Sequence, residues 1–180
     1  MSRRTISRIV STLVLVFLLY SWWHQRSQLV PPSVSAADPT ASVITHVVDG
    51  DTFDVAINGH TMRVRMIGMD TPETVKPNTP VQCYGPEASA KGKAVLSGQT
   101  VTLSRDPIAG DSDQYGRALR YVTLPDGSDY GQLMISAGYA REYDFKNQPY
   151  AHRTIYRAAQ TDAQANHRGL WSADTCNGGR

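Results

Sequence analysis

Acidic residues are absent before Asp38, and this absence changes the meaning of the chain's charge. The sequence of 180 residues carries a formal net charge of +2, but four of its 18 basic residues lie in that acid-free stretch. From Asp38 onward, 14 basic residues stand against 16 acidic ones, a net charge of −2. This part therefore does not bind polyanions through overall positive charge. If it binds one, we expect a local group of Arg and Lys, with a metal ion neutralising nearby carboxylates.

Histidine pairs with metal-binding spacing are also absent. The five histidines form no His-Glu-x-x-His or zinc pattern, and His152 and His167 lie far apart. This argues against a zinc hydrolase. We interpret His46, in a predicted strand, as a packed or surface residue and not as a catalytic base.

An apolar run spans Ile9–Trp23, and it follows three arginines within the first eight residues. This order predicts a cytoplasmic N-terminus and translocation of the rest of the chain. The run of about 15 residues is shorter than the ~20 that cross a hydrocarbon core of ~30 Å. Two interpretations remain open: an uncleaved signal-anchor, or a signal peptide cleaved after Val34-Ser35-Ala36. That cleavage site lies far beyond Trp23, which favours the anchor.

Composition divides the chain into four parts. We expect a hydrophobic helix, serving as signal-anchor or signal peptide, within residues 1–26. Residues 27–41 are rich in Pro, Ser and Ala and predict a linker. Residues 42–172 should form one domain, followed by a C-terminal tail at 173–180. The domain is expected outside the cytoplasm, as a monomer held at the membrane by the N-terminal segment, or secreted if that segment is cleaved.

Cysteine is scarce, with Cys83 and Cys176 as the only two, and both fall in the part expected to be exported. An even pair in an oxidising compartment predicts one disulfide. Such a bridge would attach the C-terminal tail to the domain. Closing a loop of roughly 94 residues would stabilise the fold by about 4–5 kcal/mol in the chain-entropy model.

The domain is predicted to be mainly β with helices. Alternating or β-branched residues predict five strands, at 43–48, 52–57, 60–69, 100–104 and 116–124. Asn58-Gly59 is typical of a hairpin turn between the second and third strands. Three helices are expected, at 84–97, 130–137 and 151–166. Five strands, mostly consecutive, predict a small β-barrel with flanking helices.

Two acidic turn motifs flank the third predicted strand. Asp49–Thr52 lies at the bend between the first and second predicted strands, and Asp70–Glu73 follows the end of the third. Hard divalent cations prefer carboxylate, carbonyl and water oxygens. Either motif alone is typical of an ordinary turn or helix start, but together they predict a cation site with Asp51 and Asp70 as its carboxylates.

Several motifs together resemble the staphylococcal nuclease (thermonuclease) family. They occur in the family's order and at similar spacings, from about Val43 to Trp171: Asp49–Thr52, Arg65–Glu73, Tyr84–Ser89, Asp113–Arg117 and Gly169–Trp171. One such motif is weak evidence, whereas five in register are specific. The resemblance implies a five-stranded OB-fold barrel with three α-helices, which agrees with the strand and helix pattern.

The resemblance also implies a calcium-dependent nuclease acting on DNA and RNA. Asp51 and Asp70 would ligate Ca²⁺, together with the backbone carbonyl of Thr71. Asp49 would orient the site from outside the ligand shell. Glu73 would be the general base that activates water, or the group that positions it.

Arg65 and Arg117 would hold the scissile phosphate. The arginine fork matches two phosphate oxygens and stays protonated at any working pH. Arg63 shares the predicted strand face of Arg65, but the family motif places only the second arginine at the phosphate. We therefore interpret Arg63 as a solvated strand residue.

Four tyrosines require separate interpretations. Tyr115 would stack on a base or bond a phosphate, with packing at the barrel rim as the alternative. Tyr143 lies near the position of a further substrate-binding aromatic of the family, although an ungapped count from Gly138 places that position at Asp144. Tyr150 and Tyr156 are interpreted as packing residues of the last helix.

Two other functions are compatible with the fold. A catalytically silent OB barrel could bind nucleic acid or act as a scaffold while tethered to the membrane. A tethered structural protein would explain the apolar run. Neither of these two functions explains why the acidic residues and the arginines occur together, so an enzyme is favoured.

Overall fold

The computed structural model describes Tyr20, residues 40–75 and residues 77–179. The chain divides into two units, Met1–Ser35 and Ala36–Arg180, and the second carries the barrel and its flanking helices. Apart from Tyr20, the helix expected at 1–26 lies outside the described residues, as does most of the expected linker. Within the described part of the chain, no helix is both long and apolar enough to cross a membrane.

Among residues 40–75 and 77–179, five strands close a barrel in the order β1-β2-β3-β6-β5. Their bounds are β1 (Thr40–Val47), β2 (Thr52–Ile57), β3 (His60–Met66), β5 (Thr100–Ser104) and β6 (Ala118–Thr123). Neighbours are antiparallel except β3 and β6, which are parallel. The predicted five-stranded barrel is confirmed. Thr40 and Ala41, which were expected in the linker, belong to β1.

The barrel core follows the alternation of side chains along each strand. Val64 and Met66 of β3 are buried, whereas Arg63 beside Val64 is exposed. The third strand ends at Met66 and not at Met69, so the sequence-based boundary was wrong. Gly68 adopts a φ of 75°, which lets the chain turn so that Ile67 and Met69 are both buried. This turn sets the direction of the next segment, which contains Asp70.

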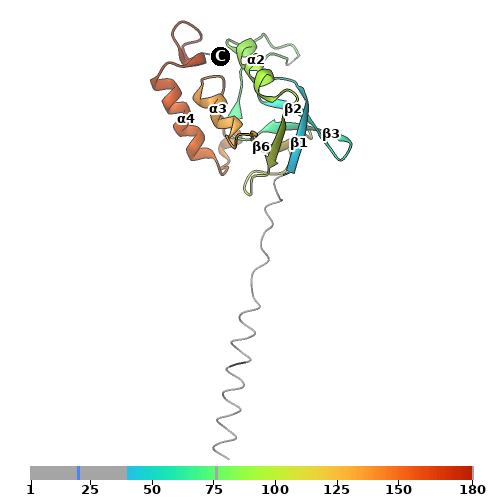
Figure 1. The fold of residues 1–180 in the computed structure, drawn as a ribbon. Coiled ribbons are helices and arrows are strands. Elements are labelled where there is room, and N and C mark those ends of the chain that lie inside the picture. Colours follow the sequence, from blue (N-terminus) through green and yellow to red (C-terminus); the bar gives the residue numbers. More distant parts are fainter. Residues whose placement is uncertain (1–19, 21–39, 76, 180) are drawn as a thin grey trace, which may run out of the picture. The chain divides into compact units, whose positions relative to one another are not determined.

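Three α-helices lie around the barrel in the described residues, as predicted: α2 (Gly85–Leu96), α3 (Tyr130–Ser136) and α4 (Arg153–Ala165). Helices α3 and α4 pack against each other on one side of the strands, and α2 lies at the upper end in the view of Figure 1. Asp129 immediately precedes α3, and its side chain accepts the Gln132 N–H at 3.0 Å. This is an N-cap that satisfies a helix-end donor.

Four short elements of the described residues were not predicted as separate elements: β4 (Met69–Asp70), β7 (Arg141–Glu142), η1 (Phe145–Asn147) and η2 (Gly169–Trp171). Strands β4 and β7 pair with each other outside the barrel. Two or three residues are too few to show a period, so no sequence pattern could reveal them.

A disulfide joins Cys83 to Cys176, with 5.9 Å between their Cα atoms. The predicted pairing is therefore present. Cys83 lies just before α2, and Cys176 lies in the C-terminal tail after η2. The bridge attaches the tail to the segment that leads into α2.

Candidate active site

Gly50 allows the first acidic turn to approach the second. A Cβ at Gly50 would lie 2.6 Å from Cγ2 of Thr71 and 3.2 Å from the carbonyl oxygen of Ala88 in α2. Its own carbonyl accepts the buried hydroxyl of Tyr130 at 2.7 Å. The bend between β1 and β2 is thus held against both α2 and α3, and only glycine fits at its centre.

The Asp51 carboxylate connects the two acidic motifs. Its Oδ2 accepts the backbone N–H of Thr71 at 2.9 Å and the Thr71 hydroxyl at 3.1 Å, and its Oδ1 accepts the Thr52 hydroxyl at 2.9 Å. Burial alone would raise the pKa of Asp51, but the charge of Arg65 and the Thr71 N–H outweigh it and lower that pKa. Asp51 is therefore a buried, ionised group.

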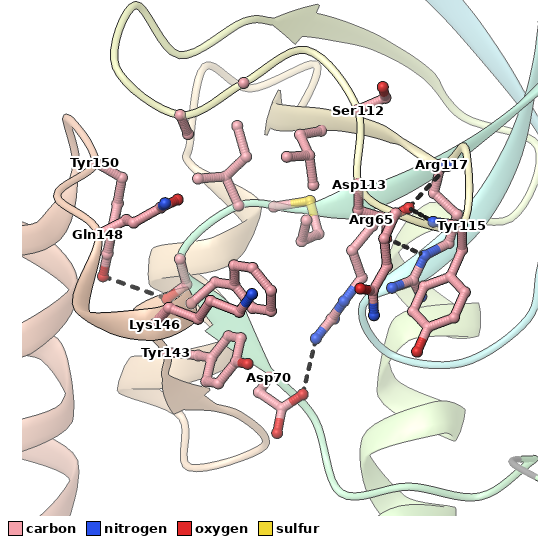
Figure 2. A pocket seen from close by; sticks show the side chains of 18 of the residues that line it. Arg65, Asp70, Ser112, Asp113, Tyr115, Arg117, Tyr143, Lys146, Gln148 and Tyr150 are labelled. Carbon is pink, nitrogen blue, oxygen red and sulfur yellow. Dashed lines mark hydrogen bonds and ion pairs between the residues drawn. The ribbon is translucent and has the colours of Figure 1, made fainter.

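Arg65 of β3 lies between the two predicted calcium ligands. Its guanidinium contacts the carboxylate of Asp51, and its Nη2 lies 2.8 Å from Oδ1 of Asp70. The Arg65 side chain is only 12% exposed. Figure 2 shows it directed at Asp70. The sequence placed these three residues in one site, and the structure brings them into contact.

Asp49 adds a third carboxylate to this cluster. Its Oδ1 accepts the backbone N–H of Asp51 at 3.3 Å. Burial and the neighbouring charge of Asp51 raise the pKa of Asp49 to about 7. Three carboxylates thus surround one guanidinium, which leaves an excess of negative charge.

Glu73 lies after β4, on the connection to α2. Its Oε1 accepts the backbone N–H groups of Thr74 at 2.9 Å and Val75 at 2.8 Å. Its own N–H donates to the side-chain oxygen of Gln82 at 2.9 Å. The segment is irregular, so these bonds take the place of a helix or a strand in fixing the carboxylate.

Arg117 approaches the same region from the loop before β6. Asp113 holds it twice: its Oδ2 lies 2.6 Å from the Arg117 Nε, and its Oδ1 accepts the Arg117 backbone N–H at 3.0 Å. The guanidinium carbon of Arg117 lies 5.4 Å from the centre of the Tyr115 ring. Asp113 therefore aims the arginine, although the sequence analysis did not assign it a role.

These side chains line a cleft of about 520 Å³, which we call the carboxylate cleft. Its polar lining includes Asp49, Asp51, Arg65, Asp70, Thr71, Glu73, Gln82 and Arg117. Every predicted catalytic, ligand and outer-shell residue therefore meets at one place. Gln82 was missed because it lies in a connection without periodicity.

A second pocket of about 620 Å³ adjoins the cleft and shares Arg65, Asp70, Tyr115 and Arg117 with it. We call it the aromatic pocket. Tyr115 and Tyr143 lie on opposite sides of it in Figure 2. Tyr115 is 74% exposed, which excludes packing at the barrel rim as its role.

The structure distinguishes Tyr143 from Asp144. Tyr143 is 39% exposed and lines the aromatic pocket. Asp144 instead contacts the guanidinium groups of Arg153 and Arg157 on α4. The ungapped count therefore named a residue that the structure uses to attach α4. Lys146 also lines the pocket, and no sequence signal marked it because its turn is irregular.

The residues interpreted as structural make structural contacts, although Arg63 also lines the carboxylate cleft and Tyr150 also lines the aromatic pocket. Arg63 is bound by Asp54 of β2 through two nitrogens, at 2.8 and 3.0 Å. His46 is a surface residue with its Nδ1 3.4 Å from Asp54. Tyr150 and Tyr156 are buried in the core, although Tyr150 precedes α4 and does not belong to it.

The donor set is suited to a hard cation. Asp51 and Asp70 supply carboxylate oxygens that both contact the Arg65 guanidinium, and Asp51 also accepts the Thr71 backbone N–H. Within the described residues, no group of three or more His, Cys, Asp or Glu side chains is arranged to hold a metal. A cation would thus depend on two carboxylates, a carbonyl and water, and Arg65 would have to release one of its partners.

Comparison with known proteins gives a consistent result. A family model described as "Staphylococcal nuclease homologue" matches residues 63–173. A thermonuclease of Staphylococcus hyicus is 35% identical over 96% of this chain and 99% of its own length. Endonuclease YncB of Bacillus subtilis is 36% identical over 72% of this chain and 60% of its own length. An uncharacterized endonuclease of Escherichia coli O157:H7 is 32% identical over 88% of this chain and 87% of its own length.

Proposed function

The chain belongs to the staphylococcal nuclease family, and from this premise we propose that it is a calcium-dependent nuclease that hydrolyses phosphodiester bonds of DNA and RNA. Relatives named thermonuclease and endonuclease make it a nuclease hydrolase.

One observation supports this proposal: carboxylates and guanidinium groups, which carry opposite charges, line the same cleft. Asp51, Asp70 and Glu73 supply carboxylates, and Arg65 and Arg117 supply guanidinium groups. A phosphodiester under attack gains charge on its oxygens, and arginine forks are the side chains best matched to it. Carboxylates in the same cleft would repel that phosphate unless a cation neutralised them.

Ca²⁺ would be held by the carboxylates of Asp51 and Asp70 and by the Thr71 carbonyl. Asp49 would orient Asp51 by accepting the backbone N–H of Asp51. Bound there, the ion would polarise a phosphate oxygen and help to present water. Glu73 would accept a proton from the attacking water or position that water.

Arg65 and Arg117 would bind the phosphate oxygens and stabilise their developing charge. The contacts of Arg65 with Asp51 and Asp70 hold its guanidinium at the cleft before a substrate arrives. Tyr115 and Tyr143 would stack on bases in the aromatic pocket, since stacking tolerates any base. This would suit an enzyme that accepts both DNA and RNA.

We further propose that the domain works outside the cytoplasm as a monomer, held at the membrane by its N-terminal segment or secreted after cleavage. The apolar run and the disulfide both support export. Sequencing the mature N-terminus distinguishes the two forms. A start near Ala37 means a secreted protein, and an intact Arg3 region means an anchored one.

A cleavage assay tests the central proposal. Purified protein is incubated with single-stranded DNA or with RNA, in calcium or in excess chelator, next to a Glu73→Gln variant. We expect both substrates to be cut in calcium only and Glu73→Gln to be strongly impaired. Binding without cleavage would favour the silent OB-fold module. Undiminished cleavage in chelator would remove calcium from the mechanism.

A further inference from the structure

Gln82 holds the backbone of Glu73 through two hydrogen bonds. Its side-chain oxygen accepts the Glu73 N–H at 2.9 Å. Its own backbone N–H donates to the Glu73 carbonyl at 2.9 Å. Two bonds from one residue fix both the position and the orientation of Glu73, within a connection that has no regular structure of its own.

Gln82 is in turn fixed by the residues after it. Its carbonyl accepts the N–H of Gly85, at the start of α2, at 3.0 Å. The next residue, Cys83, is bonded to Cys176 of the C-terminal tail. Gly85 also approaches Glu73 closely, since a Cβ there would lie 3.1 Å from the Glu73 carbonyl oxygen. The place of Glu73 therefore depends on the place of Gln82.

The tail that carries Cys176 is held at a second point. Arg141 of β7 donates to the carbonyl oxygens of Gly178 at 2.9 Å and Gly179 at 2.8 Å. Arg141 is also the register partner of Asp70 in the β4–β7 pair. The tail thus contacts two segments that lead directly to the site, one bonded to Glu73 and one paired with Asp70.

We propose that Gln82 is a positioning residue for Glu73 and that the Cys83–Cys176 disulfide holds Gln82 in place, so that the cleavage rate depends on the oxidation state of this bond. The inference rests on the proposed function. Cys83 is exposed, so a reductant can reach the bond. A dithiol would transfer two electrons and two protons to the disulfide, giving two thiols, and would itself form a disulfide.

The expected effect is on turnover and not on substrate binding. Loss of the Gln82 acceptor leaves the Glu73 N–H without its partner and lets the carboxylate move. A misplacement of about 1 Å at a catalytic group can reduce kcat up to about 100-fold. Substrate contacts through Arg117 and Tyr115 do not involve Gln82, so KM should change little.

A matched set of glutamine variants tests the positioning role. Gln82→Met keeps the length of the side chain but removes the acceptor. The control is Gln160→Met, because Gln160 accepts the Glu142 N–H at the same 2.9 Å but lines neither pocket. We expect Gln82→Met to lower kcat about 10- to 100-fold with KM nearly unchanged, and Gln160→Met to keep most of the kcat.

The oxidation arm compares untreated protein, dithiol-treated protein and a Cys83→Ser/Cys176→Ser double variant. Hydrogen exchange of the metal-free proteins is measured on peptides containing Glu73 and, as a folding control, on peptides from α4. We expect faster exchange at Glu73 and a lower kcat after reduction, with α4 still protected. The double variant should show the kcat and the Glu73 exchange of the reduced protein, and dithiol treatment should change neither.

The two readouts separate this inference from the proposed function. If untreated protein cuts nucleic acid, and neither Gln82→Met nor reduction alters kcat or exchange at Glu73, the positioning role is refuted while the nuclease stands. If no form cuts nucleic acid, the proposed function fails, and the exchange data alone decide whether Gln82 and the disulfide hold Glu73.

Discussion

The carboxylate of Asp51 accepts the backbone N–H of Thr71 across 2.9 Å, although 20 positions separate the two residues in the chain. The bond joins the turn after β1 to the segment that carries Asp70 and Glu73. The site therefore exists only when these two segments have been brought together by the fold. Its geometry also depends on Gly50, which lies between Asp49 and Asp51.

Replacing Gly50 with Ala should damage both stability and activity. The new Cβ would lie 2.6 Å from Cγ2 of Thr71, so Thr71 or the β1–β2 turn must shift. Overpacking of this kind typically costs about 1–3 kcal/mol. Urea unfolding measures the loss, and kcat of the folded variant measures the damage to the site. Gly110→Ala is the control, because its nearest neighbour would be 3.9 Å away. Equal stability of the two variants would contradict the close approach.

Arg65→Lys should not support normal cleavage. Separate parts of the Arg65 guanidinium contact Asp51 and Asp70, and an ammonium cannot reproduce this planar fork. Loss of one preorganised donor typically reduces kcat about 10²–10³-fold. Turnover on single-stranded DNA is the measurement. Arg63→Lys, on the same strand but bound by Asp54, should retain activity. Near-normal turnover of Arg65→Lys would contradict a phosphate-binding role for Arg65.

The barrel could be predicted from the sequence because long-range pairing leaves a local signal there. Alternation and β-branched residues marked β1, β2, β5 and β6, and Asn58-Gly59 marked the hairpin. The end of β3 could not be placed, since Gly68 turns the chain while the apolar residues continue through Met69. In the sequence, buried apolar residues that follow a strand cannot be distinguished from residues of the strand itself.

The site was predictable to the extent that its residues lie at strand ends in recognisable motifs. Asp51, Arg65 and Asp70 were placed together and are in contact. Gln82 was not found, because its bonds to Glu73 arise in an irregular connection. Tyr143 could not be separated from Asp144 by counting, since only the contacts of Asp144 with α4 show which side chain is free to line the pocket.

Calcium should stabilise the protein as well as activate it. A ligand that binds only the folded state at 100 times its Kd adds about 2.7 kcal/mol. Thermal unfolding in calcium should therefore show a higher Tm than in chelator, and Asp70→Asn should abolish the difference. Asp174→Asn, in the exposed part of the tail, is the matched control and should keep it. A shift that persists in Asp70→Asn would place calcium elsewhere.

Substrate binding should be weak without calcium and sensitive to salt. The domain carries a net charge of −2 from Asp38 onward, so attraction for phosphate must come from a bound cation and from basic side chains that line the two pockets, such as Arg65, Arg117 and Lys146. Screening weakens such contacts steeply. Fluorescence anisotropy with labelled single-stranded DNA and the Glu73→Gln variant measures this without cleavage. Affinity that is independent of both calcium and salt would argue for binding through another surface.

Asp106 should make the fold sensitive to acid. Burial alone would raise its pKa, but the Tyr121 hydroxyl and the N–H groups of Ala151, Ala109 and Ile108 outweigh burial and lower it. A carboxylate with a depressed folded-state pKa stabilises the protein above its unfolded pKa of about 3.9. That contribution is lost as the pH falls through the folded-state value.

Asp106→Asn should therefore lower the free energy of unfolding at pH 7 by about 1–3 kcal/mol. Both Asp106 oxygens accept backbone N–H groups, so either orientation of the amide would direct its NH₂ at a donor. The difference from wild type should shrink at pH 3, because below the unfolded-state pKa of about 3.9 the unfolded carboxylate takes up a proton and the folded state loses part of its advantage. Asp126→Asn, at an exposed turn, should change much less because water replaces its contacts. Urea unfolding at the two pH values gives both comparisons, and a deficit that does not depend on pH would show that Asp106 acts through packing and not through charge.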